Sequence, residues 1–132
     1  MCKVLLVDDH DLTLLCQKIL WKSRFSIIPD VAKNGEEALE FLKSNRYDCI
    51  IVDYEMYGMR GDELIKRIRK IDGYLNKPLI VLSTYAVEDF AVSCICAGAD
   101  DYIVKPIEEE TYFGYINKYL DLNKIKKAIN AN

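Results

Sequence analysis

Short runs of apolar, strand-forming residues alternate along the chain with longer segments that repeat their apolar residues at helical spacing. The strand-like runs cover residues 3–8, 25–32, 48–53, 77–83 and 101–105. Amphipathic helices are predicted over residues 12–23, 35–44, 61–71, 87–98 and 108–120. The pattern therefore predicts five strand–helix repeats.

Local residues set several of the expected boundaries. Pro29 places the second strand at a sheet edge, Asn34 is an expected N-cap, and Gly98 is expected to end the fourth helix. The apolar positions of the first helix are Leu12, Leu15, Cys16, Ile19 and Leu20, and those of the third, expected to face inward, are Leu64, Ile65, Ile68 and Ile71.

Uninterrupted apolar strands separated by helices indicate a parallel sheet covered on both faces. The number of repeats fits an α/β fold with a single doubly wound five-stranded parallel sheet of the flavodoxin-like (βα)5 type, in strand order 2-1-3-4-5. We expect one domain over residues 1–120. Residues 121–132 are polar and lysine-rich, and they are expected either to extend the last helix or to begin a linker.

Composition narrows the possible functions. The chain has 132 residues, a net charge of −3 and an isoelectric point near 5.2, which argues against direct nucleic-acid binding. No apolar stretch approaches the ~20 residues of a membrane helix, and the first residues resemble a strand rather than a signal peptide. The five cysteines are scattered and the chain has one histidine, His10, so these residues would make a poor zinc site. The cysteines are expected to be reduced thiols. We therefore expect a cytoplasmic protein without a membrane partner.

Polar residues follow four of the predicted strands. They are Asp8 and Asp9, Asp53, Ser83 and Thr84, and Lys105. In such a sheet the carboxyl ends of these strands are neighbours, so these side chains are expected to share one pocket. Three carboxylates there would repel one another unless a cation joined them, and their oxygen atoms suit Mg²⁺ or Mn²⁺. A lysine and a hydroxyl beside the cation suit a phosphoryl group, and Asp53 then becomes a carboxylate nucleophile.

Each residue also has a structural explanation. Asp9 or Asp11 is suited to cap the first helix, Ser83 or Thr84 the fourth, and Lys105 is suited to lie on the surface. The occurrence of such groups at four separate strand ends favours the functional interpretation. His10, despite its acidic neighbours, is interpreted as an ordinary residue of the loop or first helical turn.

The segments "VDD" (7–9), "VDYEM" (52–56), "LST" (82–84) and "YIVKP" (102–106), with "GADDY" before the last strand, resemble a receiver domain of two-component signalling, the CheY-like family of response regulators. The resemblance covers residues 3 to about 120. It implies that Asp53 accepts a phosphoryl group, that Asp9, Asp53 and the backbone carbonyl of Glu55 bind the cation, and that Asp8 holds a metal-bound water. Ser83 and Lys105 match the switch hydroxyl and the lysine of the family, with Thr84 beside them.

The resemblance also implies a function. A phosphohistidine on a sensor histidine kinase or histidine phosphotransfer protein would donate to Asp53, and Tyr102 with Ser83 would report the state to a downstream effector. That effector would bind the face formed by the fourth helix, fifth strand and fifth helix. The aromatic set of Tyr112, Phe113, Tyr115 and Tyr119 is expected mainly in the core and on the helix surface, and it can also contribute to this face. Such a protein is a switch that loads and loses its own phosphoryl group, not a turnover enzyme. The Lys105–Pro106 peptide is expected to be cis.

This sequence departs from the family pattern near the phospho-acceptor. Tyr57 replaces the usual proline, which restores a backbone N–H and puts an aromatic ring beside the site. Thr84 stands where a small residue is common, while Glu55 and Tyr85 occupy positions that tune dephosphorylation in the family. These departures are expected to alter access to the phosphoryl group and its lifetime.

Three other functions stay open at this point. A haloacid-dehalogenase-type phosphatase also forms an aspartyl-phosphate but uses Asp-x-Asp, where this chain has Asp53-Tyr54-Glu55. A flavin or nucleotide carrier would need a phosphate-cradling first loop rather than "DDHD". The third is a docking module that works without phosphorylation, which the intact acidic set disfavours.

Overall fold

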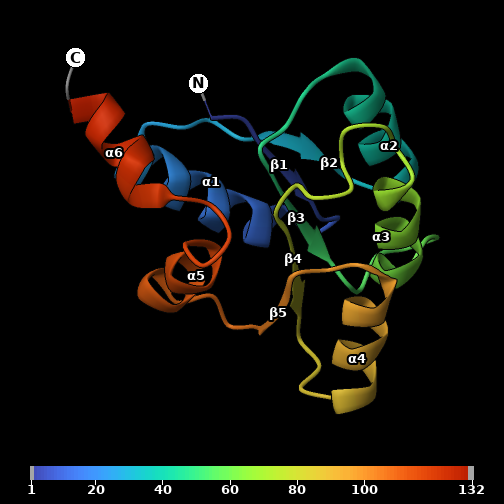
Figure 1. Cartoon of the computed structure of the whole chain (residues 1–132). Helices are drawn as coiled ribbons and strands as arrows, with labels where there is room; N and C mark the ends of the chain where they lie inside the picture. Colours follow the sequence, from blue (N-terminus) through green and yellow to red (C-terminus); the bar gives the residue numbers. More distant parts are fainter. Residues whose placement is uncertain (1, 131–132) are drawn as a thin grey trace.

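Five parallel strands form one sheet in a computed structural model that describes residues 2–130 (Figure 1). The strands are β1 (Val4–Val7), β2 (Asp30–Ala32), β3 (Cys49–Asp53), β4 (Leu79–Ser83) and β5 (Asp101–Val104). The helices are α1 (Asp11–Phe25), α2 (Gly35–Ser44), α3 (Gly61–Arg69), α4 (Glu88–Ala97), α5 (Glu109–Ile116) and α6 (Leu122–Asn130). The strand order β2-β1-β3-β4-β5 confirms the predicted topology.

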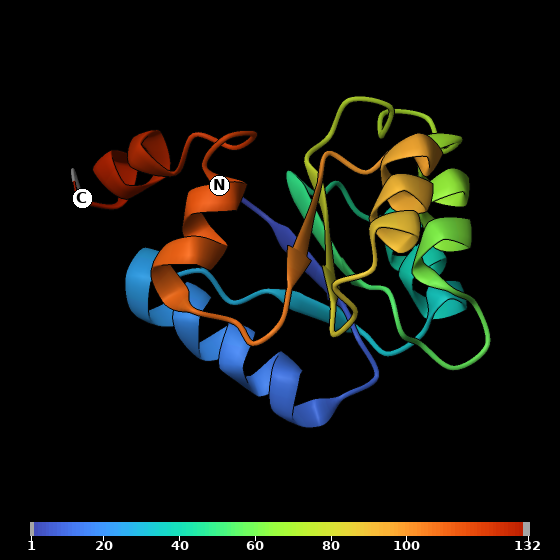
Figure 2. The same ribbon diagram turned by 90° about the horizontal axis from the view of Figure 1, so that it is seen from below.

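Helices cover both faces of the sheet, with α2, α3 and α4 on one side and α1, α5 and α6 on the other (Figure 2). Successive residues of a strand alternate between two cores, because side chains point to opposite faces of a sheet. In β1, Leu5 and Val7 join the first core, while Val4 and Leu6 join the second. All four are buried, so the uninterrupted apolar run correctly indicated a sheet covered on both faces.

The expected boundaries hold at several points and fail at others. Asn34 caps α2 by accepting a hydrogen bond from the Glu37 N–H at 2.8 Å, and Gly98 ends α4 with φ at 123°. The strand predicted over 25–32 is wrong in extent, since Phe25 ends α1, Ser26 turns the chain at φ 54°, and only Asp30–Ala32 pairs with β1. β2 is an edge strand, as Pro29 indicated.

The first helix buries a different face from the one that contains Leu12, Leu15 and Ile19. Leu12, Leu15 and Ile19 are 74%, 51% and 57% exposed. The buried residues are Leu14, Gln17, Trp21 and Phe25. Tyr112 of α5 accepts a hydrogen bond from Trp21 Nε1 at 2.9 Å and donates to Gln17 Oε1 at 2.7 Å, so this polar cluster in the core is satisfied.

The chain after β5 forms two helices rather than one. The helix predicted over 108–120 ends at Ile116, and α6 follows with Leu122 buried and Ile125 and Ile129 packed against the second core. Residues 131–132 of the predicted extension lie outside the described residues. Among residues 2–130, no helix has the length and apolar character needed to cross a membrane.

Candidate functional site

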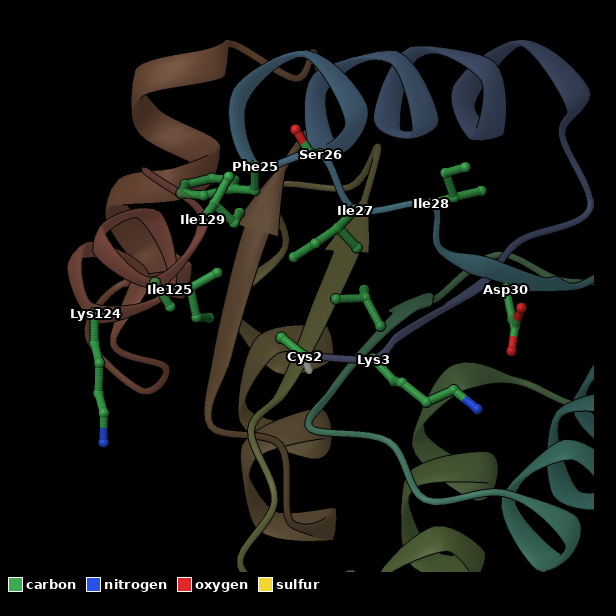
Figure 3. A pocket seen from close by; sticks show the side chains of 12 residues that line it. Cys2, Lys3, Phe25, Ser26, Ile27, Ile28, Asp30, Lys124, Ile125 and Ile129 are labelled. Carbon is green, nitrogen blue, oxygen red and sulfur yellow. The ribbon is translucent and has the colours of Figure 1, made fainter. Parts of the chain in front are cut away.

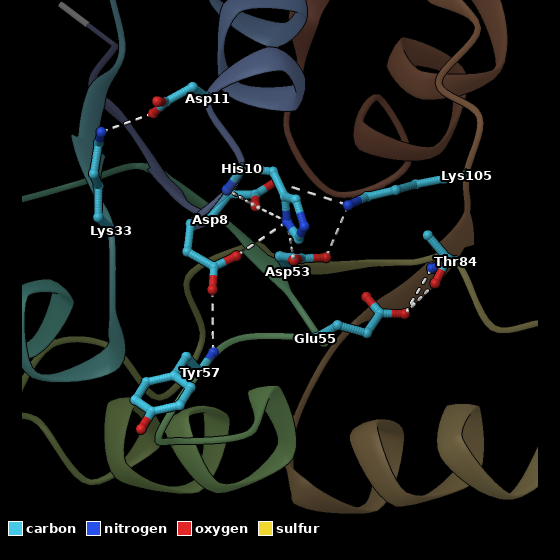
Figure 4. A network of polar contacts seen from close by, with 10 residues as sticks. Asp8, His10, Asp11, Lys33, Asp53, Glu55, Tyr57, Thr84 and Lys105 are labelled. Carbon is cyan, nitrogen blue, oxygen red and sulfur yellow. Dashed lines mark hydrogen bonds and ion pairs between the residues drawn. The ribbon is translucent and has the colours of Figure 1, made fainter.

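The carboxyl ends of β1, β3, β4 and β5 bring the predicted site residues together (Figure 4). Asp53 is the last residue of β3, Ser83 the last of β4, and the Lys105 N–H continues the β4–β5 pairing by donating to the Ser83 carbonyl at 2.8 Å. Asp8 follows β1 directly and is held by the hydrogen bond from its N–H to the Ala32 carbonyl. Strand pairing therefore fixes the backbone of each site residue.

Lys105 is directed at the two buried carboxylates. Its Nζ lies 3.0 Å from Asp53 Oδ1 and 3.8 Å from Asp8 Oδ2, and both aspartates are 1% exposed. The lysine is therefore not a surface residue. Its peptide bond to Pro106 is cis, as expected. One lysine faces two buried carboxylates, so it cannot neutralise both of them when both are ionised.

The acidic residues are suited to a divalent cation. Asp8 Oδ2 and Asp53 Oδ2 are buried and accept no hydrogen bond from the described residues. Burial and the nearby Asp8 raise the pKa of the Asp53 carboxyl to about 8, although Lys105 opposes the shift. Oxygen atoms of Asp8, Asp9 and Asp53 lie within 4.8 Å of one another, as the ligands of one ion do. Carboxylate oxygens of this kind fit Mg²⁺ or Mn²⁺.

Glu55 has a role that the sequence analysis missed. Its Oε1 accepts three hydrogen bonds, from Ser83 Oγ at 2.6 Å, from the Thr84 N–H at 2.8 Å and from Thr84 Oγ1 at 2.8 Å. Burial alone would raise the pKa of Glu55, but these hydrogen bonds outweigh it and lower that pKa to about 2. The Glu55 carboxylate thus occupies the hydroxyl donors of Ser83 and Thr84 and the Thr84 N–H. Its backbone carbonyl was predicted as a metal ligand and its position as one that tunes dephosphorylation, but these hydrogen bonds to Ser83 and Thr84 were not predicted.

Ser83 is connected to Tyr102 through one residue of backbone. The Tyr85 N–H donates to Ser83 Oγ at 3.0 Å, and the Tyr102 hydroxyl donates to the Tyr85 carbonyl at 2.7 Å. Tyr102 is half-buried and packs against the first core. A movement of the Ser83 hydroxyl would therefore strain or break a contact that leads to Tyr102.

Tyr57 contributes its backbone rather than its ring. The ring is 94% exposed and points away from the carboxylates, contrary to the expectation that it would crowd the site (Figure 4). The Tyr57 N–H donates to Asp9 Oδ2 at 3.1 Å. A proline at this position would lack that donor.

We expect Tyr57→Pro to weaken Mg²⁺ binding, because Asp9 would lose the hydrogen bond that orients its carboxylate. The matched variant Tyr57→Ala keeps the N–H and loses only the ring, so its affinity should stay within about twofold of the parent. Loss of a group that orients a metal ligand typically costs about 10-fold or more in affinity. Calorimetric titration with Mg²⁺ measures both variants, and equal affinities would show that the N–H is irrelevant.

The structural explanations for the polar residues do not hold. Neither α1 nor α4 has a side-chain cap, so Asp9, Ser83 and Thr84 are not present as helix caps. Asp11 instead pairs with Lys33 at 2.7 Å. His10 lies at the start of α1, as predicted, and its ring turns toward the carboxylates (Figure 4).

A separate hollow lies at the opposite end of the sheet. This pocket of about 820 Å³ is bordered by Cys2, Phe25, Ile27, Ile125 and Ile129 and lies between α6 and the start of β1 (Figure 3). None of the predicted site residues lines it. The acidic site is therefore distinct from this apolar pocket.

Comparison with known proteins places these features in context. A family model described as the response regulator receiver domain matches residues 4–130. The chemotaxis protein CheY of Bacillus subtilis is 32% identical, and the match covers 90% of this chain and 98% of the relative. Hybrid signal transduction histidine kinase I of Dictyostelium discoideum is 33% identical over 98% of this chain, which spans only 8% of that protein. The structure of chemotaxis protein CheY4 of Vibrio cholerae, 29% identical, superposes with a TM-score of 0.85 and covers 91% of this chain and 99% of its own.

Proposed function

The chain belongs to the response regulator receiver domain family of two-component systems, and from this premise we propose that Asp53 accepts a phosphoryl group from a phosphohistidine on a partner protein. Receiver domains are signalling switches rather than classical enzymes. The observation that carries the proposal is the buried Asp53 carboxylate, which has Lys105 on one oxygen and no hydrogen-bond donor among the described residues on the other. A bound dication would keep this carboxylate ionised despite its raised pKa, and its unpaired oxygen would then be the nucleophile.

The side chains divide the chemistry of the transfer among them. An Asp53 oxygen forms the new P–O bond as the P–N bond to the donor histidine breaks, and the histidine nitrogen leaves with the electron pair. Lys105, 3.0 Å from Asp53, balances the charge of the arriving oxygens. A Mg²⁺ or Mn²⁺ ion held by Asp8, Asp9, Asp53 and the Glu55 carbonyl would supply further charge neutralisation. Attack of water on the phosphorus would break the P–O bond to Asp53 and release inorganic phosphate, so the same site would also lose its phosphoryl group.

Phosphorylation would then require Glu55 to release Ser83 and Thr84. The Glu55 carboxylate and the phosphoryl oxygens would need the same hydrogen-bond donors, and two anions at one position repel each other. Release of Ser83 is expected to reach Tyr102 through the Tyr85 backbone. We propose that this movement alters the face of α4, β5 and α5, where a downstream effector would bind.

Glu55→Gln is expected to raise the initial rate of loading by about tenfold, because removing about 1.4 kcal/mol of repulsion is tenfold in rate. The amide keeps the size of the side chain and can still accept from Ser83. Loading from acetyl phosphate, followed by intact mass, measures the rate. Glu36→Gln is the control, since Glu36 lies exposed on α2. A parental rate in Glu55→Gln would show that the carboxylate does not compete with the phosphoryl group.

The donor protein is proposed to dock on the exposed apolar face of α1. This face contains Leu12, Cys16 and Ile19, and a groove joins it to Pro106 and Ile107, next to Lys105. A partner that covers these residues would reach the mouth of the acidic site. The occupant is a sensor histidine kinase or histidine phosphotransfer protein, because it must carry the phosphohistidine.

Leu15→Lys is expected to slow transfer from a phosphorylated histidine donor at least about tenfold, since it places a charge in a desolvated contact. Leu15 lies on the same exposed face and is 51% exposed, so folding should be preserved. Loading from acetyl phosphate, which needs no protein contact, is the internal reference. Equal losses with both donors would place the defect in the site rather than in docking.

Acetyl phosphate with Mg²⁺ tests the proposed function itself. The expected result is one added phosphoryl group, labile to hydroxylamine, as an acyl phosphate is. A folded protein without any mass increase would indicate a docking module that works without phosphorylation. Hydrolysis of many phosphate esters per molecule would indicate a phosphatase instead.

A further inference from the structure

His10 occupies an unusual place beside the acidic site. It is the N-cap residue of α1, yet its side chain makes no capping hydrogen bond. The backbone N–H of His10 donates a hydrogen bond to Asp8 Oδ1 at 2.9 Å, which fixes the backbone next to the carboxylates. The ring therefore remains free of any helix-capping role.

The imidazole nitrogen faces the carboxylates at short range. His10 Nδ1 lies 3.0 Å from Asp9 Oδ1, 3.4 Å from Asp8 Oδ1 and 3.8 Å from Asp53 Oδ2. The ring is 62% exposed, so solvent and a hydrated ion can reach it. One nitrogen and three carboxylates within 4.8 Å of one another match the spread of ligands around a single ion.

The buried oxygens provide a second, independent indication of a ligand. Asp8 Oδ2 and Asp53 Oδ2 accept no hydrogen bond from the described residues, although both side chains are 1% exposed. Buried carboxylate oxygens without donors are costly unless an ion compensates them. Asp53 Oδ2 is also the oxygen that faces His10, so an ion on it would lie within reach of the imidazole.

We propose that His10 Nδ1 is a direct ligand that favours first-row transition-metal dications over Mg²⁺ at this site. Mg²⁺ prefers oxygen ligands, whereas imidazole best suits the later divalent ions of that row; Mn²⁺, which also favours oxygen ligands, binds imidazole more weakly than they do. Asp9 and Asp53 would hold either kind of ion, and His10 would add a bond only for the transition metals. The inference rests on the proposed function, because this ion is the one that the switch would use.

Mn²⁺ tests the inference without any measurement of activity. Electron spin-echo envelope modulation of the full chain with one equivalent of Mn²⁺ is expected to show coupling to a ¹⁴N nucleus, and His10→Gln is expected to abolish it. Calorimetry should show that the ratio of Mn²⁺ affinity to Mg²⁺ affinity is lower in His10→Gln than in the parent by about tenfold or more. Loss of a residue that only hydrogen-bonds to a metal ligand already lowers affinity by about this factor. Asp53→Asn should weaken both ions and so identifies the site that is observed.

Absence of ¹⁴N coupling in a Mn²⁺-bound protein would overturn the inference and leave His10 as a polar contact of Asp9. An unchanged affinity ratio in His10→Gln would overturn it equally. Loading of the parent protein from acetyl phosphate with Mg²⁺ is recorded in parallel. If loading fails while the ¹⁴N coupling is present, the proposed function is wrong and the metal assignment stands.

Discussion

Asp53→Asn is expected to abolish phosphoryl loading completely. The amide has nearly the shape of the carboxylate, so it can still lie beside Lys105, but it cannot form an acyl phosphate. After incubation with acetyl phosphate and Mg²⁺, intact mass should show no adduct, whereas the parent chain gains one phosphoryl group. The effect is a loss of the whole signal rather than a change of rate.

Asp11→Asn is the matched control for this experiment. Asp11 lies two residues beyond Asp9, but its carboxylate is exposed and pairs with Lys33. Loading should therefore continue as in the parent. An adduct of equal size in Asp53→Asn would move the phospho-acceptor to another residue, and peptide mapping of the hydroxylamine-treated protein would locate it.

The strand ends could be predicted because they depend on simple rules. Asp8, Asp53 and Lys105 each follow an apolar run, and parallel topology brings such positions to one edge of the sheet. The buried face of α1 could not be chosen in the same way. Apolar residues occur around the whole helix, and the contacts of Trp21 and Phe25 with the α5 aromatics decide which side is buried.

The break after α5 had a signal that was overlooked. Asp121 accepts a hydrogen bond from the Lys124 N–H at 2.9 Å, and Asn117 accepts one from the Leu122 N–H at 3.1 Å. Asp and Asn are common at helix ends, where their side chains accept hydrogen bonds from backbone N–H groups. The segment therefore forms a separate helix rather than an extension of α5.

The side-chain direction of Glu55 and of His10 could not be read from sequence. The Glu55 side chain is oriented by donors at the end of another strand, such as Ser83. The His10 ring is oriented by the carboxylate of its neighbour in the loop, Asp9. Tyr57 shows the same limit, because its ring turns outward while its N–H contacts Asp9. Spacing predicts which residues share a pocket, and packing decides which atoms face it.

Asp8→Asn is expected to make the metal-free protein more stable and to remove most of the stabilisation by Mg²⁺. Asp8 and Asp53 are buried carboxylates that share Lys105, and each makes ionisation of the other costly, so replacing Asp8 removes that cost, while the oxygen of the introduced amide can still accept from the His10 N–H. The parent should gain about 2.7 kcal/mol at a Mg²⁺ concentration of about 100 times Kd, or roughly 10 °C in Tm. Thermal unfolding with and without Mg²⁺ measures both effects, and Asp72→Asn, an exposed acid remote from the site, should respond as the parent does. A metal-free Asp8→Asn protein less stable than the parent would show that Asp8 stabilises the fold by its charge, and that the buried acids are not held at a cost for binding an ion.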